Sequence, residues 1–589
     1  MIFAKDHKTS NLFEPLDRFG KHRRARIENG WAHLFREQIL PQLPVHQLRP
    51  YYSGSQGAPT KDLYAMLGIM LLQQMHDLTD EETTDQVAFN IKWQYALNLS
   101  EEIERENYVC PKTLWSFRHL LAEKNLSGTI FTTITDHLAK LFSIDSTRQR
   151  LDSVHVFSNM RRLGRIGLFV RTIKGFLVNL RRHHKALFSA LPEVLTKKYL
   201  HKSQESVFSM VKPSESEKTL ATLGEDLLFL AESFAGEQAV SGMDSFKTLY
   251  RLLAEQCEAT SDVATRKKTF RVKANKDVAS DSLQNPSDPD ATYCGHKGKG
   301  YQAQIQETYI PLPPPGENGE AQEPAPLRLA LHVAVEEAHR SDAHALLPAI
   351  ADVKERGFAP QEVLADSLYG SEKNVDEAAV AGVEVVAPVP GGEKKGKSSF
   401  LSEFTFTQED GIALCPAGHA PIEDESVRKH RKVVFATADC LGCPKRKECP
   451  VKSVKKGYGF AYDKKQVKMA RRRAREKTAE FADRYRHRSG VEATMSALDR
   501  LTGVKQLRVR GMDAVRFAVT MKVLGLNVFR SAAFVKSKNG GKILGNGARS
   551  LAWEAAARLY KACCFKWRCL VIHLAPGAGD RFYPIEMAA

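Results

Sequence analysis

Apolar residues along this chain change their spacing several times, and each change predicts a different kind of element. Between Leu48 and Leu121 they recur every three or four positions, as in DLYAMLGIMLLQQMHDLTDEETTDQVAFN, a spacing typical of amphipathic helices. The last of these helices, PKTLWSFRHLL, opens with Pro111, which the first turn of a helix tolerates. The pattern therefore predicts an all-helical N-terminal domain.

Short apolar runs rich in β-branched residues predict buried strands farther along the chain. RLDSVHVFSNM contains Asp152 and VLADS contains Asp366, while YQAQIQETY, LRLALHVAVEEA and GVEVVAPVP are further strands. Between them, HALLPAIADVKERG has helical spacing and ends at Gly357, a residue type that often ends helices. This order of strands and helices, with two insertions, fits an α/β fold with a mixed sheet and flanking helices.

The same patterns divide the chain into segments. The predicted boundaries are 1–145 for the N-terminal helical domain, 146–159 for the first strand of the core, 160–289 for a helical insertion, 290–400 for the continued core, 401–463 for a cysteine-containing insertion, 464–535 for the C-terminal helices of the core, and 536–589 for a tail.

A third acidic residue accompanies Asp152 and Asp366. Tyr485, Arg488 and Glu492 lie at i, i+3 and i+7, so a helix would carry them on one stripe. A lone strand-end Asp usually caps a helix or pairs with an arginine. Three carboxylates that converge, however, are what a two-metal phosphoryl-transfer site requires, because paired Mg²⁺ ions need shared anionic oxygen ligands.

The segments LDSVHVFSNMRRLGRIG, ADSLYGSEKN and YRHRSGVE resemble the three catalytic blocks of bacterial insertion-sequence DDE transposases, and the last matches their Y-x2-R-x3-E signature. The resemblance extends from about Leu48 to Phe534. It implies an RNase H-like core in which Asp152, Asp366 and Glu492 are catalytic and hold two Mg²⁺ or Mn²⁺ ions. It also implies cleavage of transposon ends in double-stranded DNA and transfer of the freed 3′ end to target DNA.

The resemblance extends to the residues around the acids. Arg488 would grip a DNA phosphate and Tyr485 would contact the flanking strand, although an ordinary Arg–Glu ion pair at i, i+4 is the simpler alternative. The family signature usually continues to a Lys seven residues after the Glu, where this chain has Asp499 followed by Arg500. We expect Arg500 to substitute for it. In the family the helical N-terminal domain binds DNA ends; a purely structural role is the alternative.

Charge supports a polyanionic partner. Lys and Arg number 86 against 69 acidic residues, a net charge of +17. A basic run from Lys452 to Lys477, which includes Arg471, Arg472 and Arg473, leads into the Glu492 helix and predicts contacts with the DNA backbone. A second basic stretch follows Asp152 and includes Arg161, Arg162 and Arg165. It fits a solvated helix face and the lining of a DNA channel equally well.

Four of the ten cysteines gather in one part of the sequence, at Cys415 in CPAGH and at Cys440, Cys443 and Cys449 in CLGCPKRKECP. Thiolates at C-x2-C spacing are good tetrahedral Zn²⁺ ligands, and clustered cysteines in a reducing compartment favour a metal over disulfides. We therefore predict a zinc site, with His419 as a replacement ligand. Spare reduced thiols are the alternative.

Several other functions are weighed against these predictions. Residues 391–398, GGEKKGKS, match the P-loop pattern, but the next segment, SFLSEFTFTQEDG, lacks helical spacing, so a hinge is the better interpretation. No secretory signal or bilayer-length apolar run is evident, which predicts a cytoplasmic, nucleoid-associated protein without membrane partners. A nuclease or resolvase with the same carboxylates, and an inactive DNA-binding repressor, are alternatives to a transposase. Pairing of two DNA ends predicts a homodimer.

Overall fold

The computed structural model describes residues 2–7, 19–54, 56–99, 104–160, 163–200, 211–261, 268–311, 326–391, 399–427 and 430–538. The chain divides into a unit of Met1–Ala532 and a second unit of Ala533–Ala589. Of the second unit, the described ranges include only 533–538, the last residues of a helix. Several parts of the chain with predicted roles lie outside the described residues: 392–398 of the predicted hinge, Arg161, Arg162 and the tail beyond 538.

The N-terminal part is helical, as its periodicity predicts. Its α-helices are α1 (Lys21–Glu28), α2 (Trp31–Leu34), α3 (Leu63–Met75), α4 (Asp80–Phe89), α5 (Ile91–Ala96), α6 (Glu104–Asn107), α7 (Pro111–Glu123) and α8 (Ser127–Leu141). Helix α3 is buried along most of its length, and Asp62 caps its first turn by accepting a hydrogen bond from the Ala65 amide. Thr79 and Glu82 form a capping box at the start of α4.

A six-stranded mixed sheet follows. Its strands are β1 (Arg148–Phe157), β4 (Thr292–Cys294), β5 (Gly298–Thr308), β6 (Ala330–Glu337), β7 (Glu362–Leu364) and β8 (Glu384–Val386). Strand β5 pairs antiparallel with β1 on one side and with β4 and β6 on the other. Strands β7 and β8 continue the sheet beyond β1 and run parallel to it. Strand β1 is therefore central, between an antiparallel and a parallel half.

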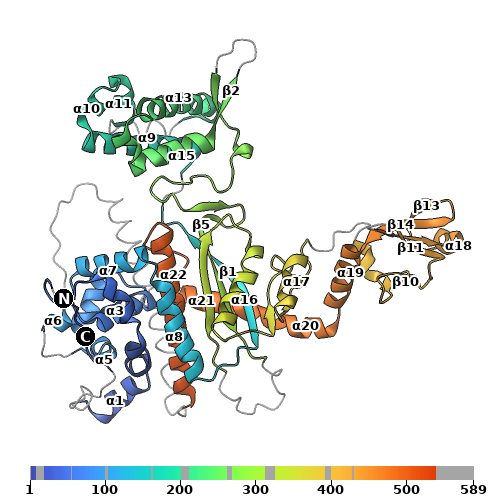
Figure 1. Ribbon diagram of the computed structural model, residues 1–589, viewed down its shortest axis with the longest axis horizontal. Helices are drawn as coiled ribbons and strands as arrows, with labels where there is room; N and C mark the ends of the chain where they lie inside the picture. The colour runs from blue at the N-terminus through green and yellow to red at the C-terminus, as the bar shows by residue number, and fades with distance from the viewer. Residues whose placement is uncertain are drawn as a thin grey trace, which may run out of the picture. The chain divides into compact units, whose positions relative to one another are not determined.

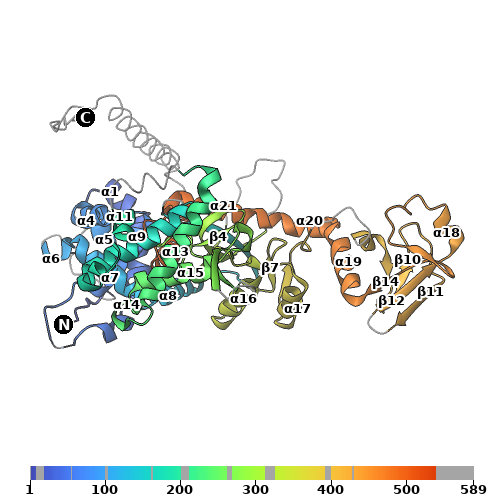
Figure 2. The same ribbon diagram turned by 90° about the horizontal axis from the view of Figure 1, so that it is seen from above.

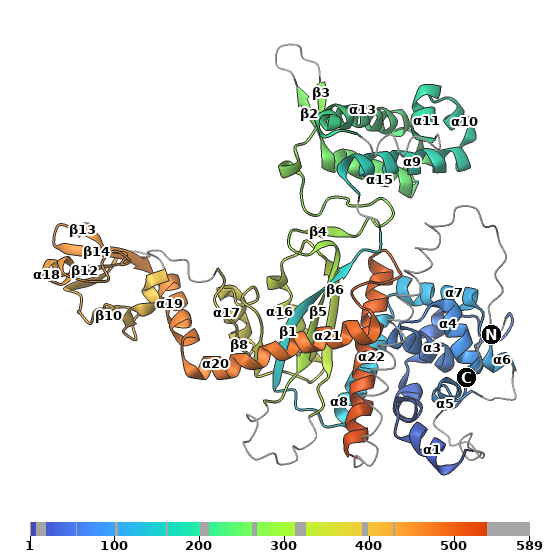
Figure 3. The same ribbon diagram turned by 180° about the vertical axis from the view of Figure 1, so that it is seen from behind.

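Helices cover both faces of this sheet. α16 (Leu346–Glu355) and α17 (Glu372–Val380) lie on one face, and α21 (Gly490–Thr502) crosses the other, as the opposite views in Figures 1 and 3 show. Because side chains alternate along a strand, Leu151 packs with Ile350 of α16 in one hydrophobic cluster. Its neighbours Arg150 and Asp152 face α21. At β1, Leu151 thus packs among apolar residues, whereas Arg150 and Asp152 lie on the opposite, charged face.

The helical insertion between β1 and β4 has a hydrophobic core of its own. It contains α9 (Arg165–His183), α10 (Lys185–Ser189), α11 (Glu193–Leu200), α13 (Ser216–Phe234), α14 (Gln238–Ser241) and α15 (Asp244–Gln256), then a hairpin of β2 (Cys257–Ser261) and β3 (Lys268–Val272). Phe169, Phe176, Leu227 and Leu249 are fully buried where α9, α13 and α15 pack side by side (Figure 2). The sequence did not predict the hairpin.

The start and the end of this insertion meet at Asp288. Its carboxylate accepts hydrogen bonds from the Ser158 hydroxyl, one residue after β1, and from the Tyr301 hydroxyl of β5. The Gly511 amide donates to the same carboxylate at 3.1 Å. The insertion therefore leaves the sheet and returns to it at one point. Arg165, from the predicted basic stretch, donates to Gln256 at 2.7 Å and to Asn275 at 3.0 Å.

The cysteine-containing segment forms a small β module, which the sequence did not predict. Its elements are β9 (Thr405–Phe406), β10 (Ile412–Leu414), β11 (Glu423–Val427), β12 (His430–Phe435), α18 (Thr437–Leu441), β13 (Lys452–Val454) and β14 (Gly457–Asp463). Four of the strands form a sheet in the order β11-β12-β14-β13. Phe435 and Tyr462 are buried in the hydrophobic cluster of this module, together with Val467 from the next helix.

The last helices return to the large sheet. They are α19 (Lys464–Glu476), α20 (Ala479–Tyr485), a 3₁₀ turn (Arg486–Ser489), α21 and α22 (Met512–Lys538). Among the described residues, α22 is the one helix long and apolar enough to cross a bilayer by length and composition. Its most apolar window is 67% buried inside the protein, which is typical of a core helix.

Candidate active site

The first predicted acid, Asp152, lies in the middle of β1. It stands opposite Ile305 of β5 in the antiparallel pairing. Its Oδ1 accepts a hydrogen bond from the Ser153 amide at 2.9 Å. Burial raises the pKa of the Asp152 carboxyl above its usual range; Arg488 opposes this rise, and the charges of Asp366 and Asp342 add to it. Asp152 is thus a buried acid in an environment that contains other acids.

Arg488 connects the first acid to the third. Its Nη2 donates to Asp152 Oδ2 at 3.0 Å and its Nη1 donates to Glu492 Oε1 at 2.7 Å. The Asp152 side chain is 14% exposed whereas that of Glu492 is 65% exposed, so the bridge runs from the sheet to the surface. The Nε of Arg488 is buried and has no hydrogen-bond partner among the described residues.

The second acid, Asp366, lies two residues beyond the end of β7, the strand next to β1 in the sheet. Its Oδ1 accepts a hydrogen bond from the Leu368 amide at 2.8 Å, so it lies in a turn rather than in the predicted strand. The charge of Asp366 acts on the pKa values of both Asp152 and Tyr485. The structure therefore brings Asp152, Asp366 and Glu492 into one neighbourhood.

Tyr485, Arg488 and Glu492 do not share one continuous α-helix, contrary to the prediction. Tyr485 is the last residue of α20, Arg488 lies in the 3₁₀ turn, and Glu492 is in the first turn of α21. Tyr485 stacks on Phe481, with ring centroids 5.4 Å apart, and both pack against Val386 of β8. The helix type changes here from α to 3₁₀ and back, and the periodicity of the sequence does not reveal it.

A buried ion network lies beneath the acids, and no local pattern in the sequence predicts it. Glu307 of β5 is fully buried; Arg150 Nε donates to its Oε1 at 2.7 Å, and Arg530 Nη1 donates to its Oε2 at 2.8 Å. Thr494, two residues after Glu492, donates to the same carboxylate at 2.8 Å. Burial by itself raises the pKa of Glu307, but the two arginines outweigh it and hold the pKa below its usual range.

Arg150 also fixes the turn that carries Arg488. Its Nη1 donates to the carbonyl of His487 at 2.7 Å. Gly490 lies so close to this guanidinium that a Cβ built on it would be 2.0 Å from Arg150 Nη1. In the sequence, only the presence of a glycine inside a predicted helix indicated that another group packs this closely against Gly490.

Polar groups on the other face of the sheet surround Asp342, a fourth acid. Its Oδ2 accepts from the Ser153 hydroxyl at 3.1 Å and its Oδ1 accepts from Gln304 Nε2 at 2.8 Å. Lys297 donates to the same Ser153 hydroxyl at 3.1 Å. Asp342 is therefore held by partners of its own and acts on Asp152 only through its charge.

The predicted DNA-binding arginines lie in two places. Arg500 is exposed on α21, while Arg471, Arg472 and Arg473 lie on α19. Arg471 pairs with Asp410 at 2.8 Å. Arg472 is half-buried, and its Nη2 lies 3.4 Å from the carbonyl oxygen of Ala387. Contacts of these arginines with DNA remain predictions.

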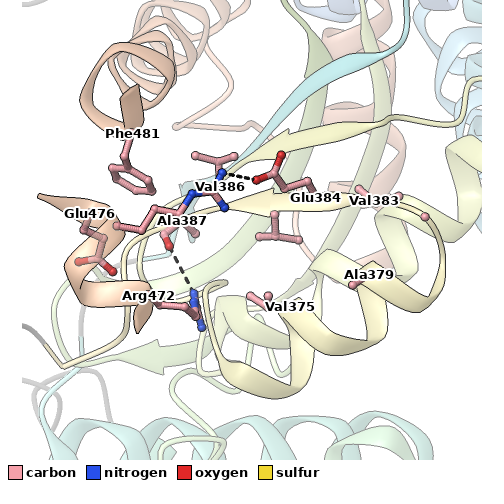
Figure 4. A pocket seen from close by; sticks show the side chains of 12 residues that line it. Val375, Ala379, Val383, Glu384, Val386, Ala387, Arg472, Glu476 and Phe481 are labelled. Atoms are coloured by element: carbon pink, nitrogen blue, oxygen red, sulfur yellow. Dashed lines mark hydrogen bonds and ion pairs between the residues drawn. The ribbon is translucent and has the colours of Figure 1, made fainter. Parts of the chain in front are cut away.

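A pocket of about 330 Å³ separates α19 from α17 and β8 (Figure 4). Its walls are mainly apolar, with Val375 and Phe481 among them, and Arg472 and Glu476 stand on the α19 side. Glu384 at its edge pairs with Arg475 at 2.8 Å. Arg472 thus helps to seat α19 against the sheet.

The donor set fits divalent ions of the Mg²⁺ class, since the three acids offer only carboxylate oxygens. Within the described residues, no three His, Cys, Asp or Glu side chains are arranged to hold a metal ion as they stand. Arg488 spans two of the three acids, and it neutralises charge there that a metal would otherwise neutralise.

Comparison with protein families supplies an independent assignment. A model described as a transposase DDE domain matches residues 414–532, a range that contains Glu492. A second, described as a transposase domain (DUF772), matches residues 31–120 in the N-terminal helices. No curated protein and no solved structure matches the chain. The two matched ranges are thus similar to transposase domains. More specifically, the two together support an insertion-sequence DDE transposase, for which DNA is the expected substrate.

Proposed function

We propose that the protein catalyses metal-dependent DNA strand cleavage and strand transfer at insertion-sequence ends, with Asp152, Asp366 and Glu492 as the metal ligands. The observation that carries the proposal is the convergence of these acids, from positions far apart in the sequence, around Arg488. Acids from a central strand, from the turn after its parallel neighbour and from a crossing helix can share ions that no one segment could hold.

We further propose that the core is RNase H-like. The supporting observation is the strand order β6-β5-β1-β7-β8, antiparallel as far as β1 and parallel beyond it. The acids then lie on and beside the central strand, where that architecture requires them.

When bound, Mg²⁺ or Mn²⁺ activates the attacking water or 3′ hydroxyl and stabilises the leaving 3′ oxygen. The three carboxylates position that chemistry. Asp152 and Glu492 would hold the ions, and Arg488, which now bridges them, would then change partners; its buried Nε has no hydrogen-bond partner within the described part of the chain. Its guanidinium is then available to a DNA phosphate, for which its forked donors are suited. We propose that Tyr485, Arg500 and the α19 arginines contact the flanking DNA.

A cleavage and strand-transfer assay tests the proposal. The purified chain is given a duplex carrying the element's inverted repeat, a precut version of that duplex, and a plasmid target, with Mg²⁺ or Mn²⁺. Asp152→Asn, Asp366→Asn and Glu492→Gln should each lower cleavage by about 100-fold or more, equivalent to about 3 kcal/mol of barrier. Glu480→Gln, which changes another exposed glutamate on the neighbouring helix, is the matched control and should retain activity.

The joined products separate the alternatives. Insertion of the precut end into the plasmid supports a transposase, whereas cleavage without joining indicates a nuclease or resolvase. Binding of the repeat without either product indicates an inactive, repressor-like derivative. A homodimer follows from the proposal because two ends must be held together. Sedimentation of the chain with the repeat duplex would measure it.

A further inference from the structure

The four clustered cysteines meet in the β module although two loops and several strands separate them. Cys415 follows β10, Cys440 is in α18, Cys443 comes two residues after that helix, and Cys449 precedes β13. All four line one small cavity of about 20 Å³. A space of that size admits about one water or one metal ion.

The backbone around Cys415 points an amide at its sulfur. Gly418 has a φ of +85°, and its amide donates to the Cys415 carbonyl at 2.8 Å to close a tight turn. The next amide, that of His419, donates to the Cys415 Sγ at 3.3 Å. An amide hydrogen bond of this kind orients the sulfur, as contacts from surrounding groups do for metal ligands.

The remaining three thiols come from α18 and the loop that follows it. Its turns are closed by the Arg446 amide, which donates to the Cys443 carbonyl, and by the Cys449 amide, which donates to the Lys445 carbonyl, both at 3.1 Å. Together with Cys415 these residues line the same small cavity, so one central divalent cation could bind all four sulfurs.

We propose that Cys415, Cys440, Cys443 and Cys449 bind a structural Zn²⁺ ion, independently of the catalytic acids. Four thiolates complete a tetrahedral shell and leave no open position, which is the pattern of structural rather than catalytic zinc. Binding must draw the thiols inward, since no three described ligating side chains are arranged to hold an ion as they stand. His419 stays outside the shell, half-exposed and 3.5 Å from Asp439.

The size of the module explains why it needs the ion. Its hydrophobic cluster consists of Leu401, Phe404, Ile412, Val433, Phe435 and Tyr462, joined by two residues of α19. Small units of this kind cannot bury enough apolar surface to be rigid, and a metal commonly supplies the missing stability. The ion would join the turn after β10 to α18 and to the loop before β13.

The test is the metal content of the intact full-length chain, purified without chelator and measured by mass spectrometry. About one zinc ion per chain is expected. Cys443→Ser and Cys449→Ser should lose it, while Cys294→Ser, a cysteine of β4 outside the module, should retain it. His419→Ala should also retain it, because four thiolates already fill the shell. Cobalt exchanged into the wild-type chain should show the absorption of tetrahedral thiolate coordination.

Removal of zinc by a chelator gives a readout that does not depend on the variants folding. The thermal unfolding midpoint should fall and recover with Zn²⁺ but not with Mg²⁺. A wild-type chain that is folded, free of zinc and reactive at all four thiols would overturn the proposal, as would disulfides among them. Loss of zinc in His419→Ala would overturn the four-thiolate shell. Asp152→Asn should keep its zinc, so failure here is distinct from failure of the proposed catalysis.

Discussion

Two arginine–carboxylate clusters lie side by side on the same face of β1, and they differ in almost every physical respect. Arg150 belongs to the inner cluster, in which Glu307 is fully buried between two arginines and Thr494. Asp152, two residues along the strand, belongs to the outer cluster, which Arg488 bridges to the exposed Glu492. The inner carboxylate has its pKa lowered, whereas the outer Asp152 has its pKa raised.

The two clusters are therefore suited to different roles. The inner one is suited to stabilising the fold, and the outer one to binding ligands. In the inner cluster two arginines and a hydroxyl satisfy one carboxylate, so the native state favours its charge and the contacts have no reason to rearrange. In the outer cluster several acids share one arginine, so the native state disfavours the charge on Asp152. Sites with perturbed pKa values of this second kind are where ligands such as metal ions are accommodated. The inner cluster attaches β1 and β5 to α21 and α22 through Thr494 and Arg530, and under the proposed function the outer one would exchange partners.

The largest difference is expected when one glutamate is neutralised in each cluster. Glu307→Gln leaves Arg150 buried without its counter-charge, and it should destabilise the fold by about 3–5 kcal/mol. Glu492→Gln, in a side chain that is 65% exposed, should change stability by about 0.5 kcal/mol or less while abolishing cleavage. Urea unfolding followed by circular dichroism measures both. Equal midpoints would show that the inner cluster does not support the fold.

A smaller effect on stability is expected at Gly490, which lies between Arg488 and Glu492 in the chain and packs against Arg150. In Gly490→Ala the new methyl group meets Arg150 Nη1, and the overpacking should cost about 1–3 kcal/mol and displace Glu492. Gly175→Ala in α9 is the matched control. No atom lies within 4 Å of its new Cβ, and it should gain up to about 1 kcal/mol. If both variants keep full stability and cleavage, the close approach has no importance.

At acid pH, the difference in stability between the wild type and Glu307→Gln should become smaller. The folded-state pKa of Glu307 is depressed, because the arginines outweigh burial. Its ionised form therefore contributes full stability above the unfolded pKa of about 4.3, and that contribution is lost as pH falls through the folded value. Unfolding midpoints of both proteins, measured from neutral pH downward, should converge below about pH 4. A difference in unfolding midpoint that stays constant with pH would contradict the lowered pKa of Glu307.

A small change in stability is expected at Arg488. Arg488→Lys cannot bridge Asp152 and Glu492 with one ammonium; it keeps a positive charge beside the buried Asp152 and loses the pair with the exposed Glu492, which contributes only about 0–1 kcal/mol. Cleavage should nevertheless fall by about tenfold, equivalent to about 1.4 kcal/mol, because the forked phosphate contact is lost. Arg484→Lys, a residue of α20 that pairs with Glu362, is the comparison. Unchanged cleavage in Arg488→Lys would exclude the phosphate role.

The sequence identified the residues of the outer cluster but not the framework under them. Asp152, Asp366 and Glu492 could be identified from the sequence because each lies in a local pattern of apolar, polar and small residues. Glu307 and Arg530 lie in segments whose periodicity indicates only a strand and a core helix, and their pairing depends on a sheet register that no local pattern specifies. The 3₁₀ turn at Arg488 is set by contacts with Arg150, which are equally distant in the chain.

The same distinction applies to the fold. Helices such as α3 and α7, with their regular apolar spacing, followed from the sequence. The β module did not, because its strands are two to seven residues long and carry many charges. Such strands form through partners and through burial of Phe435 and Tyr462, which become visible only when the sheet is assembled.

The Asp288 carboxylate accepts hydrogen bonds from Ser158, Tyr301 and Gly511, and these bonds hold the two ends of the helical insertion together. Because the segment enters and leaves the sheet at Asp288 and buries its own apolar residues, a change in its length should leave the register of β1 and β5 unaltered.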